Sequence, residues 1–161
     1  MPSVLAHVLV LCTGNICRSP MGEVLLRQYA TSRGRRVEVR SASVLGIADK
    51  PAHKNSIKVM EEFDISLRDH RSTPLTQELM NWADYVLVME YAHMARLRKK
   101  YPDCEAKVAL LGGYGGYTEI RDPVRSYFAG PFRQCRKEIL RCVEGFVDNV
   151  LPIPEATSPA E

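Results

Sequence analysis

A strand, a tight loop and a helix start between residues 7 and 20 constrain the fold more than any other part of the sequence. The stretch reads His-Val-Leu-Val-Leu-Cys-Thr-Gly-Asn-Ile-Cys-Arg-Ser-Pro. Its apolar run, residues 7–11, predicts a strand that is buried on both faces. Ser19 suits a helix cap and Pro20 the first helical position. A strand followed by a loop and a helix start predicts an anion site, because consecutive backbone N–H groups converge there and the helix dipole favours negative charge.

The loop carries a nucleophile and a cation six positions apart, at Cys12 and Arg18. Backbone dipoles and the Arg18 guanidinium both favour the thiolate form of Cys12. The planar fork of Arg18 matches two oxygens of a phosphate group better than a lysine would. The pattern therefore predicts a nucleophile, a phosphate cradle and a charge clamp on one short loop.

Residues 12–21 resemble the signature of the low-molecular-weight protein tyrosine phosphatases, which also carry it near the start of the chain. The resemblance implies a phosphatase that hydrolyses phosphotyrosine through a phosphocysteine intermediate, with no cofactor and no metal ion. It also implies that the strands lie in the order 2-1-3-4. The resemblance makes Cys12 and Arg18 catalytic. It assigns the neighbouring residues to the phosphate-binding loop: Thr13, Gly14, Asn15, Ile16, Cys17 and Ser19.

The remaining pattern predicts an α/β fold, a three-layer sandwich with a four-stranded parallel sheet and helices on both faces. We expect further strands at 37–42, 84–89 and 107–111, and helices at 22–33, 53–63, 73–83, 91–101 and 131–151. The glycine-rich segment 112–117 is interpreted as a flexible linker. We expect one phosphatase domain, residues 1–151, and a disordered tail at 152–161, which is rich in Pro, Ser and Glu.

Asp122 in Arg-Asp-Pro is the candidate general acid, because the resembling family places its acid in an Asp-Pro pair in this part of the chain. Displacing phosphate from an oxygen needs a proton for the leaving group, and a carboxylic acid can supply it. Pro123 would stiffen the loop that carries the acid. Cys12, Arg18 and Asp122 are therefore the predicted catalytic residues.

Three further side chains are expected to support the loop. Asn15 tolerates left-handed backbone geometry better than most residues. By resemblance, Ser41 and His70 support Asn15. Ser19, as a helix cap, is expected to donate its hydroxyl to the thiolate while it holds the loop. The resemblance also suggests a reversible disulfide between Cys12 and Cys17 on oxidation.

The predicted substrate rim departs from the family pattern. Many members have an aromatic residue on the loop after the second strand and tyrosines directly after Asp-Pro. Here Ile47, Val124 and Arg125 occupy the corresponding positions, with Tyr127 and Phe128 further on. Either the aromatic walls are weaker, or Tyr127 and Phe128 replace them from a shifted loop. Arg125 is either a docking charge for acidic residues or a solvated charge.

Composition limits the class of protein. The chain has 161 residues, a formal net charge of +3 and five cysteines, an odd number that fits a free thiol in a reducing cytoplasm. The charge suits an anionic substrate and is too small to indicate nucleic acid. We expect no signal peptide and no membrane association, since no apolar run reaches about 20 residues. A tyrosine-phosphorylated protein is the expected partner. By analogy with the bacterial branch of the family, an autophosphorylating tyrosine kinase is a candidate.

Four alternatives stay open. A protein-arginine phosphatase of this fold resembles the chain but carries Thr where this sequence has Ile16. An arsenate reductase of this fold needs two more cysteines after the third strand, where only Cys104 lies nearby. A thiol redox protein would use Cys12 and Cys17 and leave Arg18 unexplained. A non-catalytic phosphoprotein-binding module would be expected to lack the nucleophile or the acid.

Overall fold

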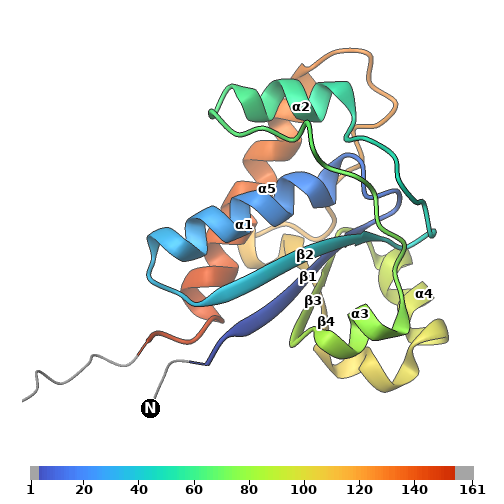
Figure 1. Ribbon diagram of the computed structural model, residues 1–161, viewed down its shortest axis with the longest axis vertical. Coiled ribbons are helices and arrows are strands. Elements are labelled where there is room, and N and C mark those ends of the chain that lie inside the picture. The colour runs from blue at the N-terminus through green and yellow to red at the C-terminus, as the bar shows by residue number, and fades with distance from the viewer. Residues whose placement is uncertain (1–3, 155–161) are drawn as a thin grey trace, which may run out of the picture.

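The computed structural model describes residues 4–154, which form a four-stranded parallel sheet between two layers of helices (Figure 1). The strand order is β2-β1-β3-β4, which confirms the predicted fold class and the order implied by the family. The strands are β1 (Ala6–Cys12), β2 (Val37–Ser43), β3 (Tyr85–Val88) and β4 (Val108–Leu110). Part of the expected disordered tail, residues 155–161, lies outside the described residues.

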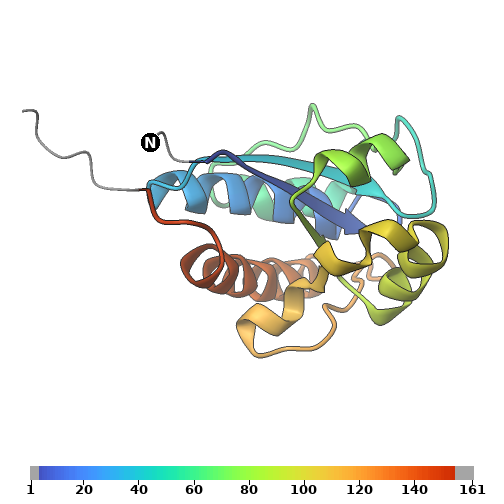
Figure 2. The same cartoon turned by 90° about the horizontal axis from the view of Figure 1, so that it is seen from below.

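Helices cover both faces of the sheet, as Figures 1 and 2 show from two directions. One face carries α1 (Arg18–Ser32) and α5 (Gly130–Asn149), with α2 (Lys54–Glu61) packed against both. The other face carries α3 (Gln77–Trp82) and α4 (Tyr91–Lys100). Two short 3-10 helices, η1 (Pro102–Lys107) and η2 (Leu111–Gly115), flank β4. No helix among residues 4–154 has both the length and the apolar character needed to cross a membrane.

The central strand β1 explains the continuous apolar run in the sequence. Val8 and Val10 point into the core shared with α1 and α5, whereas Leu9 and Leu11 point into the core shared with α3 and α4. All four side chains are fully buried. A strand covered on both faces needs apolar residues at every position rather than at alternate ones.

The first helix begins earlier than predicted, two residues before Pro20 and four before the expected range of 22–33. The helix begins at Arg18, and Cys17 precedes it without a side-chain cap. Ser19 therefore lies in the first turn rather than at the cap, and its hydroxyl contacts the thiol of Cys12 and the side chain of Asn15 instead. The hydrogen bonds of the loop therefore displace the capping pattern that the sequence suggested.

The interpretation of residues 112–117 as a flexible linker is also wrong. Most of this segment forms η2, which packs closely on α5. A Cβ atom at Gly145 of α5 would overlap the carbonyl oxygen of Tyr114, and one at Gly115 would come within 2.6 Å of the Cys142 sulfur. These glycines therefore permit a close helix–helix approach, and flexibility is not their role.

Parallel pairing brings the carboxyl ends of the strands to one edge of the sheet. Cys12 at the end of β1 is in register with Ser43 at the end of β2, and Val88 of β3 is in register with Leu110 of β4. The segments that follow all four strands therefore meet there. The segments that meet at this edge are residues 13–17, 44–50 and 89–93, together with the long loop between η2 and α5, residues 116–129.

Candidate active site

The loop between β1 and α1 is fixed by the side chain of Asn15. Its backbone is left-handed, with a φ of 55°, as the sequence predicted for an asparagine. The buried Asn15 amide donates to the hydroxyls of Ser19 at 2.7 Å and Ser41 at 3.0 Å, and its oxygen accepts from the Thr73 N–H at 3.0 Å. Its carbonyl lies 2.7 Å from the His70 ring nitrogen Nε2. The structure thus places Ser41 and His70 against Asn15.

Two further main-chain carbonyl groups of the loop, those of Thr13 and Ile16, accept hydrogen bonds from residues outside it. The Thr13 carbonyl accepts from Ser43 Oγ at 2.6 Å and from the Leu45 N–H at 3.2 Å. The Ile16 carbonyl accepts from the His53 N–H at 2.8 Å. In a trans peptide the C=O and the following N–H point in opposite directions. The N–H groups that follow these carbonyls therefore face into the loop, which makes the cradle for an anion.

Cys12 ends β1, directly before this loop, and lines the same small cavity as the loop residues. It is buried, and its sulfur is 2.9 Å from the Ser19 hydroxyl and 3.4 Å from the Ser19 N–H. Both groups can donate a hydrogen bond to the sulfur when it carries a negative charge. The Cys12 sulfur is therefore held where the first turn of α1 begins.

Arg18 is fully buried, and its guanidinium makes four hydrogen bonds, the longest from Nη2 to the Thr13 hydroxyl at 3.4 Å. Its Nη1 donates to the Ile120 carbonyl at 2.8 Å, and its Nη2 donates to Glu90 at 2.8 Å and to Asp122 at 3.3 Å. Burial alone would lower the pKa of Arg18, but the negative charges of Cys12, Asp122 and Glu90 raise it instead. Among residues 4–154 its Nε has no hydrogen-bond partner. The guanidinium thus keeps a donor for a bound oxyanion.

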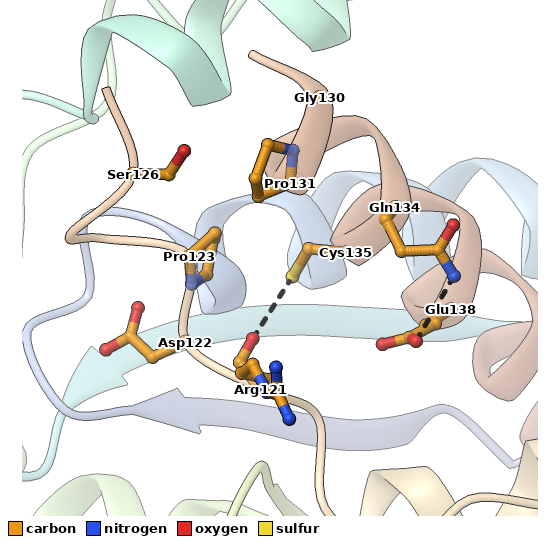
Figure 3. Close-up of a pocket in the computed structure, with 9 residues that line it drawn as sticks. All are labelled: Arg121, Asp122, Pro123, Ser126, Gly130, Pro131, Gln134, Cys135 and Glu138. Atoms are coloured by element: carbon orange, nitrogen blue, oxygen red, sulfur yellow. Dashed lines mark hydrogen bonds between the residues drawn. The ribbon is translucent and has the colours of Figure 1, made fainter. Parts of the chain in front are cut away.

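Asp122 lies on the loop after β4 and faces the same small cavity. Figure 3 shows its carboxylate turned away from Pro131 and Cys135, which line a neighbouring pocket beside α5. One carboxylate oxygen accepts from the Val124 N–H at 3.1 Å, and the other contacts Arg18. The cavity has a volume of about 150 Å³, and its lining residues come from both loops: Cys12, Thr13, Gly14, Ile16, Cys17, Arg18, Asp122 and Val124.

Cys17 lines this cavity as a second thiol of different character. Burial, with smaller contributions from Asp122 and Cys12, raises its pKa to about 12. Cys17 is therefore a protonated thiol at neutral pH. Cys12 and Cys17 line the same cavity, so the fold places the two thiols of the expected disulfide at one site.

The predicted rim residues are only partly brought together. Val124 lines the cavity, whereas Ile47, Arg125 and Tyr127 do not. Tyr127 is 85% exposed, and the Lys54 ammonium lies over its ring, 5.4 Å from the ring centre. Phe128 is similarly exposed. Neither aromatic ring lines the cavity, so the two rings do not form a packed slot around it.

Sequence reasoning missed two polar residues behind the loop, Glu90 and His93. Glu90 holds Arg18, and His93 lies 2.9 Å from the Thr13 hydroxyl and 3.3 Å from the Glu90 carboxylate. Burial and the nearby Arg18 charge lower the pKa of His93, so this ring is neutral at pH 7. One signal was available: Glu90 comes two residues after a buried strand, at the edge of the sheet where ligands bind.

Comparisons with known proteins agree with this geometry. The low molecular weight protein-tyrosine-phosphatase Etp of Escherichia coli is 40% identical over 118 residues, which cover 73% of this chain and 77% of that protein. A protein-arginine-phosphatase of Bacillus subtilis is 36% identical over 137 residues, covering 82% of this chain and 88% of that protein. The structure of Vibrio vulnificus Wzb in complex with benzylphosphonate superposes with a TM-score of 0.83 at 30% identity, covering 91% of this chain and all of that one.

The sequence profile described as low molecular weight phosphotyrosine protein phosphatase matches residues 7–152, almost the whole of the described chain. Sequence, fold and loop geometry therefore lead to the same assignment. The chain belongs to the low molecular weight phosphotyrosine protein phosphatase family.

Proposed function

We propose that this protein is a cytoplasmic protein-tyrosine phosphatase that works through a phosphocysteine at Cys12. One observation carries the proposal. Cys12, Arg18 and Asp122 line one small cavity, with Cys12 at the start of the anion cradle and Asp122 3.3 Å from the guanidinium. A nucleophile, an oxyanion clamp and a proton donor are the groups that phosphoryl transfer requires.

In the first step, the Cys12 thiolate attacks phosphorus in line with the leaving oxygen. An S–P bond forms, the P–O bond to the tyrosine breaks, and Asp122 gives its proton to the phenolate oxygen. The loop N–H groups and Arg18 bind the three equatorial oxygens, on which charge accumulates. Ser19 stabilises the sulfur because its hydroxyl lies 2.9 Å away.

In the second step, water attacks the phosphocysteine and Asp122 accepts the proton of that water. The P–S bond breaks, inorganic phosphate leaves and the thiolate is regenerated. The Ser19 hydroxyl stabilises the departing sulfur, so the same hydrogen bond serves both steps. Over the two steps the phosphate ester and one water are consumed, and the Cys12 thiolate and the protonated Asp122 are regenerated.

We also assign Glu90 to the positioning of Arg18. A guanidinium must present its donors in a fixed plane to bind two phosphate oxygens. The Ile120 carbonyl and the Glu90 carboxylate hold the two terminal nitrogens at 2.8 Å each, which fixes that plane. His93 and Thr13 connect Glu90 back to the phosphate loop.

Tyrosine is the proposed phosphorylated residue, and phosphoarginine is the second candidate. The family contains both activities, as the names of the Escherichia coli and Bacillus subtilis relatives state. Ile16 lines the cavity, and a branched apolar side chain favours an aryl group over a charged guanidinium. The arginine phosphatases that the sequence resembles carry Thr at this position. A tyrosine-phosphorylated kinase of the autophosphorylating bacterial type is the proposed partner.

The test compares two substrates on one enzyme. We expect the wild-type protein to release phosphate from a phosphotyrosine peptide at least about tenfold faster than from a phosphoarginine protein, measured as kcat/KM. Ile16→Thr is the matched variant, and it should narrow this ratio. Faster turnover of phosphoarginine by the wild type would assign the second function. Undiminished turnover of either substrate by Cys12→Ser would remove the mechanism for both.

A further inference from the structure

A second cavity adjoins the phosphate cavity across Thr13. It has a volume of about 290 Å³ and lies between the loop after β2 and the first turns of α4, lined by Thr13, Val44, Leu45, Glu90, Ala92, His93 and Arg96. Thr13 lines both cavities, so they lie on the two sides of one residue. A group bound in the second cavity would therefore sit beside the phosphorylated residue of a substrate.

The free charge at this cavity is positive. Arg96 is exposed and has no ion-pair or hydrogen-bond partner within residues 4–154, whereas its neighbour Arg98 pairs with Glu105 at 2.6 Å. The Glu90 carboxylate that lines the cavity is bound to Arg18 at 2.8 Å, and Arg18 also contacts Asp122 at 3.3 Å. His93 is neutral at pH 7 because burial lowers its pKa. Arg96 is thus the charge left for a ligand to satisfy.

The remaining walls of the cavity are apolar. Val44, the half-exposed Leu45 and Ala92 contribute aliphatic surface to the cavity that Arg96 also lines. Leu45 is tied to this loop, since its N–H donates to the Thr13 carbonyl at 3.2 Å. A short aliphatic chain that ends in a carboxylate matches this combination of apolar walls and one unpaired cation.

We propose that this cavity is a subsite for an aspartate or glutamate side chain that flanks the phosphorylated residue of a protein substrate. The proposal rests on the proposed function, because it places a phosphoprotein in the neighbouring cavity. The carboxylate pairs with Arg96, and the methylene groups of the ligand contact Leu45 and Val44. The protein therefore prefers acidic phosphosites, and it does so on the side of the loop that faces α4.

A charge-swap experiment tests the subsite. Three sets of phosphotyrosine peptides carry Glu, Gln or Lys at each position within two residues of the phosphotyrosine. kcat/KM is measured for wild type, Arg96→Glu and the matched control Lys99→Glu, which makes the same charge change one turn further along α4. We expect wild type to prefer a Glu peptide over its Gln counterpart by about 2- to 5-fold at one position, the range of an exposed ion pair. Arg96→Glu should prefer Lys there, and Lys99→Glu should behave as wild type.

The outcomes separate the two proposals. Each rate is divided by the rate of the same variant on p-nitrophenyl phosphate, which has no flanking residues. Equal ratios for the Glu, Gln and Lys peptides in wild type, or an equal change in Arg96→Glu and Lys99→Glu, would overturn the subsite while leaving the phosphatase intact. An inactive wild type on p-nitrophenyl phosphate would instead overturn the proposed function.

Discussion

The phosphate loop and the substrate rim lie side by side at the same edge of the sheet, and they are built in opposite ways. In the loop, the side chains of Asn15, Arg18 and Ser19 are fully buried. Asn15 donates hydrogen bonds to Ser19 and Ser41, and Arg18 donates one to the Ile120 carbonyl. On the rim, Val124 is partly exposed and Tyr127 is 85% exposed. The loop is thus over-determined by hydrogen bonds, whereas the rim is free to change without disturbing the fold.

Catalysis and substrate choice therefore reside in different parts of the molecule. The chemistry depends on atoms fixed to within a few tenths of an ångström, and only a buried network gives that precision. Substrate choice depends on exposed side chains that make few internal contacts. Changes in the loop should therefore remove turnover, and changes on the rim should shift which substrate is used.

The largest expected effect is a difference in kcat/KM between variants of two arginines, Arg18 in the loop and Arg125 on the rim. Arg18→Lys should lower kcat/KM for p-nitrophenyl phosphate by about 10²- to 10³-fold, because a lysine cannot present two donors in one plane. Arg125→Lys on the rim should change it by less than about threefold. Steady-state kinetics of the two variants measures both. Similar losses in the two variants would contradict the contrast between loop and rim.

The next effect concerns the brace of the loop. Asn15→Gly keeps a residue that tolerates the left-handed backbone but removes the hydrogen bonds to Ser19, Ser41 and Thr73. We expect the free energy of unfolding in urea to fall by about 1–3 kcal/mol, since buried partners are left unsatisfied. We also expect kcat to fall. A stable variant with wild-type kcat would show that backbone shape alone maintains the loop.

A smaller effect should appear when an aromatic wall is added to the rim. Val124→Tyr places a ring beside the cavity that Val124 lines. It should lower KM for a phosphotyrosine peptide by about 2- to 5-fold through ring stacking. kcat should stay near wild type, because the loop is untouched. A change confined to kcat would show that residue 124 acts on the chemistry rather than on binding.

The smallest effect is a pH dependence of stability at His53, which joins the loop to α2. Its Nδ1 accepts from the Asn55 N–H at 3.0 Å, and burial together with the Lys54 charge lowers its pKa. The unfolded chain therefore binds a proton more readily than the folded one, and stability falls as the pH drops below about 6.5. We measure the free energy of unfolding in urea at pH 7.5 and at pH 5.5. The decrease between the two pH values should be smaller in His53→Asn than in wild type, by less than about 1 kcal/mol. An equal loss in both proteins would exclude His53 as its source.

The sequence predicted the loop well because its parts are contiguous. Cys12 and Arg18 lie at the two ends of one strand–loop–helix unit, so local pattern was enough to place them together. The assignment of Asp122 as the general acid depended on its Asp-Pro pair and on the family resemblance. The sheet topology brings this residue to the same edge as Cys12 and Arg18. Ser41 was reached only by resemblance, because its contact with Asn15 depends on the pairing of β2 with β1.

What the sequence could not show depends on distant packing. Glu90 holds Arg18 across 72 positions of the chain, and this contact exists only because β3 lies next to β1. The glycines of segment 112–117 suggest a flexible linker in isolation, although most of this segment forms η2. Their role becomes visible only when α5 packs against them. Local patterns report on local geometry, and these errors arose where tertiary contacts override it.

Trapping the intermediate tests the central claim most directly. Asp122→Asn mixed with p-nitrophenyl phosphate should still be phosphorylated, because this leaving group needs no proton, but hydrolysis of the intermediate should slow without the base. We expect a burst of one p-nitrophenol per protein chain, and one phosphoryl group on the peptide that contains Cys12, found by mass spectrometry after rapid quenching. Turnover without a burst, or a phosphoryl group on any residue other than Cys12, would contradict the account.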